Sequence, residues 1–378
     1  MKILHTSDWH LGLTENERSL IDDQRFFIDE ICRIIEEKEI DAVIIAGDIY
    51  DRPISSAEAI KLYDYAMTCI CGDLGVPVLA IAGNHDSAER LASCRGLLKS
   101  ARLYIVGSLE QEPQKVSFDD AEIYFLPWIT EEKVRSVYPE RRDNVNSLEE
   151  AYRIVTEKMH ESFEDGKRHI VISHAFVSSS EVSESDRAAS IGYATQIPAS
   201  IFDDFDYVAL GHLHRPQNIT ETVRYAGSPM PYSFGKEEKH EKSVTVIDTD
   251  SMEQIIVPLK LLHERTTIEG TLGEILHPDC DEKIVNGYVR AVSTDTYLGL
   301  EALSELKKTY PCLLEASGKS FENDDSSVTL SIDQLDNLEK DPVEVFKFYY
   351  NDQMKCEPSG HLVELFISAV KSAEEENV

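Results

Sequence analysis

The sequence of 378 residues predicts an α/β fold, and three observations lead to this prediction. Five short apolar runs of β-branched and aliphatic residues have the length of buried strands. Helix-like stretches, for example residues 23–38 and 57–72, lie between these runs. Each run leads into a residue type that binds metal ions. Alternating strands and helices are typical of α/β domains, in which ligands gather beyond the carboxyl ends of the strands.

A short polar motif follows each of the five apolar runs. The pairs are Ile3-Leu4 before Ser7-Asp8-Trp9-His10, 42–46 before Gly47-Asp48, 78–82 before Gly83-Asn84-His85-Asp86, 170–173 before His174, and 207–210 before Gly211-His212-Leu213-His214. A single Asp or His after a strand is usually a turn residue or a satisfied polar group. Five such motifs in chain order indicate a shared site.

The sequence also predicts how the chain divides. Strand-like segments at 122–127, 223–226 and 243–248 complete the sheets of a first domain, 1–262. A small α+β domain, 263–335, follows. Its expected elements are strands at 265–269, 288–292, 312–316 and 328–332 and a helix at 300–310, with an acidic linker around the last strand.

The last part of the chain, 336–378, has the pattern of two amphipathic helices. Asp341 as N-cap, Pro342 at the first helical position and Glu344 form a start signal that resembles a capping box. Apolar residues at helical spacing are Val343, Phe346, Tyr349 and Tyr350, then Leu362, Leu365, Phe366, Ala369 and Val370. Periodicity alone favours equally a helix pair that folds back on the second domain and one that docks on another protein.

Composition excludes several classes of protein. Hydrophobic residues make up 42% and charged residues 28%, which is the balance of a globular chain. No apolar run approaches the roughly 20 residues of a membrane helix. The N-terminus lacks the pattern of a secretory signal. Seven cysteines without a CxxC pair suggest neither a disulfide framework nor a cysteine zinc site. We therefore expect a cytoplasmic protein.

The chain is strongly acidic, with a formal net charge of −33. Such a charge opposes long-range attraction to phosphate groups. A nucleic-acid substrate would therefore need local cations, either metal ions or basic residues of a partner.

Seven side chains in the motifs are candidate metal ligands: Asp8, His10, Asp48, Asn84, His174, His212 and His214. In the motifs Asp8-x-His10 and His212-x-His214, a spacing of two places both side chains on one side of an extended chain. Mixed oxygen and nitrogen donors suit Mn, Fe or Zn better than Mg or Ca. Seven donors are too many for one ion.

As an ordered set, these motifs resemble those of the calcineurin-like metallophosphoesterases. The matching motifs are Asp8-x-His10, Gly47-Asp48-x-x-Asp51, Gly83-Asn84-His85-Asp86, His174 and Gly211-His212-x-His214. The resemblance implies a β-sandwich flanked by helices that holds two metal ions. Carried over residue by residue, it implies one ion on Asp8, His10 and His214, and the other on Asn84, His174 and His212. Asp48 would bridge the two ions.

The resemblance also implies that water attacks the phosphodiester, with His85 facing the scissile phosphate. We expect His85 to donate a proton to the leaving oxygen or to orient the phosphate, while Asp51 holds its other ring nitrogen. The alternative is that His85 is a third metal ligand. Arg52 is close enough in sequence to reach a phosphate, and a surface salt bridge is its alternative role.

Further stretches resemble the nuclease subunits of bacterial complexes that process DNA ends with an ATPase. They are residues 174–177, 183–187, 205–217 and 225–234. This implies a Mn-dependent enzyme of DNA repair and recombination, exonucleolytic on duplex DNA and endonucleolytic on single strands and hairpins. It also implies that 263–335 positions DNA, that 336–378 docks on the ATPase, and that the chain forms a homodimer through helices at 57–72 and 89–101.

Two other functions remain as alternatives at this point. One is a phosphodiesterase or phosphatase for small substrates, in which the second domain covers the pocket and no partner is required. The other is a non-catalytic scaffold that tethers DNA ends for the ATPase. The complete set of ligand candidates argues against a scaffold.

Overall fold

The computed structural model describes residues 1–16, 18–188, 196–276, 282–295, 298–319 and 327–331, and then 343, 346–347, 350–351, 357–363 and 365–367. The chain divides into two compact units. The first unit contains Met1–Leu13 and Ser19–Leu262, and the second contains Thr14–Arg18 and His263–Val378.

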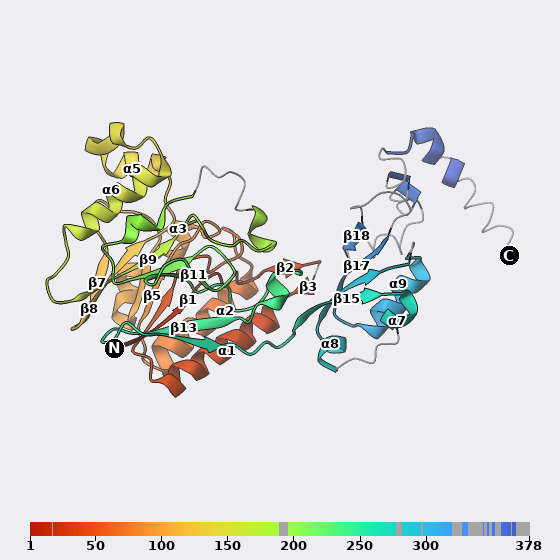
Figure 1. Ribbon diagram of the computed structural model, residues 1–378, viewed down its shortest axis with the longest axis horizontal. Coiled ribbons are helices and arrows are strands. Elements are labelled where there is room, and N and C mark those ends of the chain that lie inside the picture. Colours follow the sequence, from red (N-terminus) through yellow and green to blue (C-terminus); the bar gives the residue numbers. More distant parts are fainter. Residues whose placement is uncertain are drawn as a thin grey trace. The chain divides into compact units, whose positions relative to one another are not determined.

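The first unit contains two six-stranded sheets (Figure 1). The first sheet has the order β14-β13-β1-β4-β5-β6, in which β1, β4, β5 and β6 are parallel and β13 pairs antiparallel with both β1 and β14. In chain order its strands are β1 (Lys2–Thr6), β4 (Ala42–Ile45), β5 (Val78–Ile81), β6 (Leu103–Val106), β13 (Ser243–Asp248) and β14 (Gln254–Pro258).

The second sheet has the order β11-β12-β10-β9-β8-β7. Strands β8, β9, β10 and β12 are parallel, and the antiparallel strands β7 and β11 form the edges. In chain order its strands are β7 (Lys115–Ser117), β8 (Ala121–Leu126), β9 (Arg168–His174), β10 (Tyr207–Gly211), β11 (Gln217–Asn218) and β12 (Val223–Tyr225). The segments predicted at 122–127, 223–226 and 243–248 are therefore strands.

Alternate residues of both sheets fill the core between them, because successive side chains of a strand point to opposite faces. The first sheet contributes Ile3, Ala42, Ile44, Leu79 and Ile81, and the second contributes Ile123, Phe125, Ile170, Ile172, Tyr207 and Ala209. All of these residues are at most 3% exposed. The two sheets are therefore packed face to face as a sandwich.

Helices flank the sandwich on two sides. Helices α1 (Ile21–Lys38) and α2 (Ala57–Met67) lie on one side, and α5 (Glu131–Val137) and α6 (Leu148–His160) lie on the other (Figure 1). Buried residues of α6 recur at helical spacing and pack on the second sheet. The predicted α/β sandwich flanked by helices is confirmed.

Two stretches predicted as continuous helices are divided. Helix α2 continues as the π-helical turn η1 (Thr68–Asp73). The stretch 89–101 forms α3 (Ala88–Leu91), α4 (Arg95–Leu98) and the 3-10 turn η2 (Lys99–Ala101). Cys94 has a φ of 58°, and this left-handed conformation interrupts the helix. The nearby glycine, Gly96, lies inside α4 and not at the break.

The second unit is built on a sheet of order β15-β16-β17-β18, with β15 to β17 parallel. Its elements are β15 (Arg265–Gly270), α7 (Leu272–Leu276), α8 (Glu282–Asn286), β16 (Tyr288–Ser293), α9 (Leu300–Thr309), β17 (Leu313–Lys319) and β18 (Ser327–Ser331). The expected strands and helix are present, whereas α7 and α8 were not predicted. The core of the unit contains Ile275, Val289, Leu303, Leu306 and Leu313.

The second unit also includes the chain segment Thr14–Arg18, which the sequence does not indicate. This segment belongs to a hairpin of β2 (Thr14–Glu15) and β3 (Arg18–Ser19). The side chain of Asn16 donates to the carbonyl of Leu314 at 2.8 Å, and Glu15 pairs with the buried Arg265. These contacts fix the segment to the sheet of this unit.

Most of the predicted C-terminal helix pair, 336–378, lies outside the described residues. Within the described part, the rings of Phe346 and Phe366 stack with centroids 4.5 Å apart. No helix of the described chain combines the length and the apolar character needed to cross a membrane.

Candidate metal centre

The candidate ligands gather where adjacent strands of both sheets end. Asp8 and His10 follow β1, Asp48 follows β4, and Asn84 follows β5. His174 is the last residue of β9, and His212 and His214 follow β10. The loops are joined by main-chain hydrogen bonds, in which the amide of Asp8 donates to Gly47 and that of His10 donates to Asp48. The structure thus brings all seven predicted ligands into one cluster.

One part of the cluster contains Asp8, His10 and His214, whose ligand atoms lie within 4.8 Å of one another. The Nε2 atoms of His10 and His214 are 3.2 Å apart. Asp48 Oδ2 lies 3.8 Å from His10 Nε2. All four residues are buried, each at most 7% exposed.

The other part contains Asp48, Asn84, His174 and His212. His174 Nε2 lies 3.3 Å from Asp48 Oδ2 and 3.1 Å from Asn84 Oδ1. His212 Nδ1 is also 3.1 Å from Asn84 Oδ1. Since Asp48 contacts both parts of the cluster, its carboxylate lies between them.

The donor set fits divalent metal ions. His10 Nε2 and His214 Nε2 face each other at 3.2 Å. Two ring nitrogens that both carry a lone pair repel each other at this distance unless a proton or a cation lies between them. His10 Nδ1 is buried and has no hydrogen-bond partner among the described residues. Imidazole, carboxylate and amide donors together are typical of Mn, Fe and Zn sites.

Several ligands adopt a strained backbone. The φ angles of Asp8, His10, Asp48 and His212 are 54°, 43°, 49° and 109°. Residues other than glycine rarely adopt such values, and they persist where the surrounding structure imposes them, often at functional sites. The strain is evidence that the loops hold these side chains for a purpose other than folding.

Glycine precedes three of the ligands for a steric reason. A Cβ atom on Gly83 would lie 2.2 Å from Asp48 Oδ1, and one on Gly47 would lie 2.4 Å from His174 Nδ1. A Cβ atom on Gly211 would lie 1.9 Å from the carbonyl oxygen of Ala46. The glycines therefore allow the two sheet edges to approach closely enough for the ligands to meet.

Burial and neighbouring charges shift the pKa values of the cluster in opposite directions. Burial raises the pKa of the Asp8 carboxyl to about 6 and lowers that of His212 to about 3. Burial opposes ionisation of Asp48 and His174 as well, but their mutual attraction lowers the pKa of Asp48 and raises that of His174 to about 9.

His85 lies beside the cluster with a defined orientation. Its main-chain amide donates to Asp48 Oδ1 at 2.8 Å, and its Nδ1 is 2.9 Å from the main-chain carbonyl oxygen of Asp51. Because a carbonyl oxygen only accepts, Nδ1 is the donor. The predicted contact between Asp51 and His85 therefore involves the backbone of Asp51. Its carboxylate accepts from Arg52, whose side chain is 75% exposed.

The cluster opens into a cavity of about 230 Å³. The residues that line it are His10, Leu13, Asp48, Asp51, Asn84, His85, Ser185, Asp186, His212, His214 and Tyr232. Sequence reasoning assigned no role to Ser185, Asp186 or Tyr232, although the stretches 183–187 and 225–234 contributed to the resemblance. Tyr232 donates to the carbonyl oxygen of Trp9 at 2.6 Å and packs against the rings of His10 and His214.

This sandwich with its cluster of Asp, Asn and His side chains defines a class of protein. The family profile of the calcineurin-like phosphoesterases matches residues 1–216, and the chain belongs to that family. Over 377 residues the chain is 29% identical to the D subunit of the nuclease SbcCD of Staphylococcus epidermidis, in an alignment that covers 97% of this chain and 99% of that protein. The predicted family and the prediction of a phosphoesterase are confirmed.

Solved structures are also similar to part of the chain. A protein of Thermus thermophilus is 11% identical with a TM-score of 0.39, over 68% of this chain and 99% of its own. A dimetal phosphatase from Danio rerio is 13% identical with a TM-score of 0.39, over 69% of this chain and 99% of its own.

Proposed function

We propose that this chain is the nuclease subunit of a complex with an SbcC-type ATPase and that it hydrolyses DNA at ends and hairpins. The observation that carries the proposal is the meeting of Asp8, His10, Asp48, Asn84, His174, His212 and His214 in one buried cluster open to a cavity. The similarity to a nuclease subunit over nearly the whole chain supports the choice of DNA as substrate.

Two divalent ions, which we propose to be Mn²⁺, would supply water of lowered pKa and positive charge for the phosphodiester oxygens. One ion would be held by Asp8, His10 and His214. The other would be held by Asn84, His174 and His212, and Asp48 would bind both ions. This assignment follows the two parts of the cluster, in which Asp48 occupies the middle position.

The protein side chains orient the substrate and move a proton. His85 donates through Nδ1 to Asp51, so its Nε2 is the ring atom available to the substrate. A protonated Nε2 can donate to the leaving oxygen of the phosphodiester. The buried walls around His10 and His212 exclude bulk water and strengthen these electrostatic contacts.

Partner binding would answer the objection raised by the acidic chain. A net charge of −33 repels DNA, so cations must come from the bound metal ions and from the ATPase. We propose that 336–378 docks on the ATPase, that 263–335 positions DNA and that two copies associate through residues 57–72 and 89–101. Ile60 and Leu97, which are 53% and 76% exposed, support a contact there.

The proposal is tested by nuclease assays with Mn²⁺ on duplex, hairpin and single-stranded DNA, with and without the ATPase and ATP. Wild-type protein is expected to cut DNA, and Asp48→Ala is expected to be inactive under all conditions. A chromogenic phosphodiester is the matched small substrate. Hydrolysis of that compound without any cleavage of DNA would identify a small-substrate phosphodiesterase. Inactivity on every substrate would favour a scaffold.

A further inference from the structure

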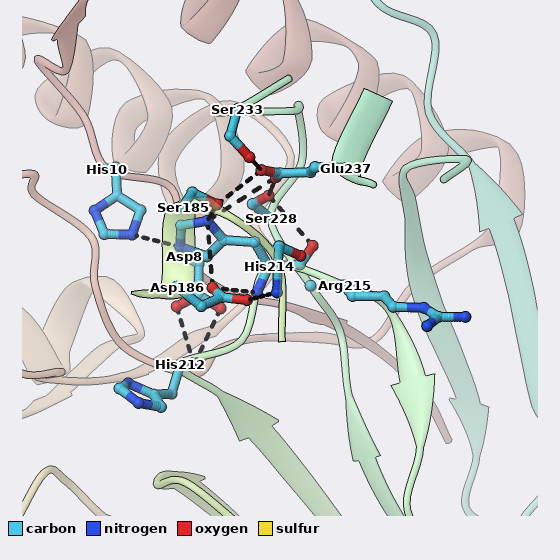
Figure 2. A network of polar contacts seen from close by, with 12 residues as sticks. Asp8, His10, Ser185, Asp186, His212, His214, Arg215, Ser228, Ser233 and Glu237 are labelled. Carbon is cyan, nitrogen blue, oxygen red and sulfur yellow. Dashed lines mark hydrogen bonds and ion pairs between the residues drawn. The ribbon is translucent and has the colours of Figure 1, made fainter. Parts of the chain in front are cut away.

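His214 is held by residues from two segments to which the proposed chemistry assigns no role. Ser185 and Asp186 lie in the 3-10 turn η4 (Ser185–Ala188). Ser228, Glu237 and Lys242 lie between β12 and β13. Figure 2 shows that Ser185 and Glu237 lie on the side of the His214 ring that faces away from His10. These contacts determine the position of the proton on the His214 ring.

The contacts fix which nitrogen of His214 carries a proton. Ser185 Oγ lies 2.7 Å from His214 Nδ1 and 2.7 Å from Glu237 Oε2. A carboxylate only accepts, so the Ser185 hydroxyl donates to Glu237, and its oxygen accepts from Nδ1–H of His214. With the proton on Nδ1, the lone pair is on Nε2, the atom that faces His10 in the cluster.

Glu237 is kept charged in the interior by Lys242. Both side chains are fully buried, and Lys242 Nζ lies 2.6 Å from Glu237 Oε1. Lys242 also donates to Ser228 Oγ at 2.8 Å and to the main-chain carbonyl of His214 at 2.9 Å. A buried ion pair is weak evidence for a gain in stability, because desolvation costs several kcal/mol per ion. Both members of this pair have a contact that reaches His214. Glu237 accepts from Ser185, which contacts the His214 ring, and Lys242 donates to the main-chain carbonyl of His214.

The main chain of His214 is also held by a side chain of the turn η4. Its amide donates to Asp186 Oδ1 at 3.1 Å. The ring nitrogen, the amide and the carbonyl of this residue therefore all have buried or half-buried side-chain partners. His174 differs, because its Nδ1 is 2.8 Å from the main-chain carbonyl oxygen of Ala46. The two parts of the cluster thus use different means to orient a histidine.

We propose that Ser185, Glu237 and Lys242 are positioning residues that orient His214 and present its Nε2 lone pair to a metal ion. This inference rests on the proposed function, because it assumes that the cluster holds metal. Groups that donate or accept behind a metal-binding histidine raise the affinity of the site, and their loss typically weakens binding by about 10–100-fold.

Two serines offer a matched comparison. Ser185 and Ser233 both donate to Glu237 Oε2 at 2.7 Å, but only Ser185 contacts the His214 ring. We therefore compare Ser185→Ala with Ser233→Ala, and use Ser185→Thr to restore a hydroxyl. Mn²⁺ binding to the full-length protein is measured by electron paramagnetic resonance of the free ion. Thermal unfolding without metal is recorded for each variant, so that a loss of fold is detected.

Ser185→Ala is expected to weaken one of two Mn²⁺ sites by about 10–100-fold and to leave the other unchanged. Ser233→Ala and Ser185→Thr are expected to stay close to wild type at both sites. Equal Mn²⁺ binding by the two alanine variants, with two sites in the wild type, would overturn this inference alone. Wild-type protein that binds no Mn²⁺ would overturn the proposed function together with it.

Discussion

The two units of the molecule both contain parallel strands joined by helices, yet only the first gathers metal-ligand residues at strand ends. In the first unit, β1, β4, β5, β9 and β10 lead into Asp, Asn and His side chains. In the second, Thr271 follows β15 and Thr294-Asp295 follows β16, and the Asp295 carboxylate accepts from the main-chain amide of Leu272 at 2.7 Å. Within the described chain, all groups of residues able to hold a metal belong to the first unit. Parallel strands thus bring the loops at their carboxyl ends together along one edge of the sheet. The residues in these loops determine whether that edge can bind metal ions.

Among substitutions in the two units, replacement of Asp48 is expected to reduce activity the most. Asp48→Ala is expected to reduce Mn-dependent phosphodiester hydrolysis by on the order of 10³-fold or more, since one missing electrostatic donor already costs about 10²–10³-fold. Asp48 lies between both parts of the cluster, so binding of two ions should fail as well. Metal analysis and single-turnover kinetics check this. Two bound ions and normal turnover in the variant would contradict the role assigned to the residue.

His85 is expected to affect turnover without affecting metal content. His85→Asn should retain both ions while the rate falls by about 10²–10⁴-fold, because a proton donor is lost. His160→Asn is the control, since the side chain of this histidine is 56% exposed and lies outside the cluster. Loss of an ion from His85→Asn would instead identify His85 as a ligand.

A core substitution in the second unit should change stability and leave the metal site intact. Leu306 on α9 is fully buried, so Leu306→Ala is expected to lower the free energy of unfolding of this unit by about 2–5 kcal/mol. Glu305→Ala on the exposed face of the same helix is the control. Denaturant unfolding and Mn²⁺ titration are measured together. Weaker Mn²⁺ binding by Leu306→Ala would show that the two units are not independent in this respect.

The smallest effect concerns a buried carboxylate of the first unit that lies outside the cluster. Burial raises the pKa of Glu122 on β8, but hydrogen bonds from Lys115, the Glu164 amide and Tyr124 lower it to about 2. Unfolded protein therefore binds a proton between about pH 4.5 and 2 that the folded protein does not, and the stability from Glu122 is lost as the pH falls through this range.

Glu122→Gln should accordingly destabilise metal-free protein at pH 7 and less so as the pH approaches 3. Unfolding by denaturant at several pH values measures the difference from wild type. A difference that stays constant with pH would refute the ion pair with Lys115 as its source. Such a result would mean that the charge of the Glu122 carboxylate does not contribute to the free energy of unfolding.

The ligands could be predicted from the sequence because their signals are local. A buried strand followed by Asp, Asn or His is readable within a few residues, as at Ala46-Gly47-Asp48. Ser185 could not be assigned to His214 in this way, because 29 positions separate them and neither Ser185 nor Glu237 follows a strand. The grouping of Thr14–Arg18 with residues after 262 likewise depends on contacts between distant positions.

Backbone conformation was the other feature that could not be predicted. The left-handed φ of Cys94 divides a stretch whose composition favours one helix. The same conformation at Asp8, His10 and Asp48 is imposed by the packed loops and not by residue type. Only the glycines, such as Gly83 beside Asp48, give a sign of this constraint in the sequence.

The central claim is that seven side chains from the ends of two sheets hold a pair of divalent ions. Anomalous diffraction from crystals soaked in Mn²⁺ tests it most directly. The account predicts two peaks roughly 3.5–4 Å apart, with Asp48 in contact with both. Absence of both peaks from the cluster, or a single peak that Asp48 does not contact, would contradict it.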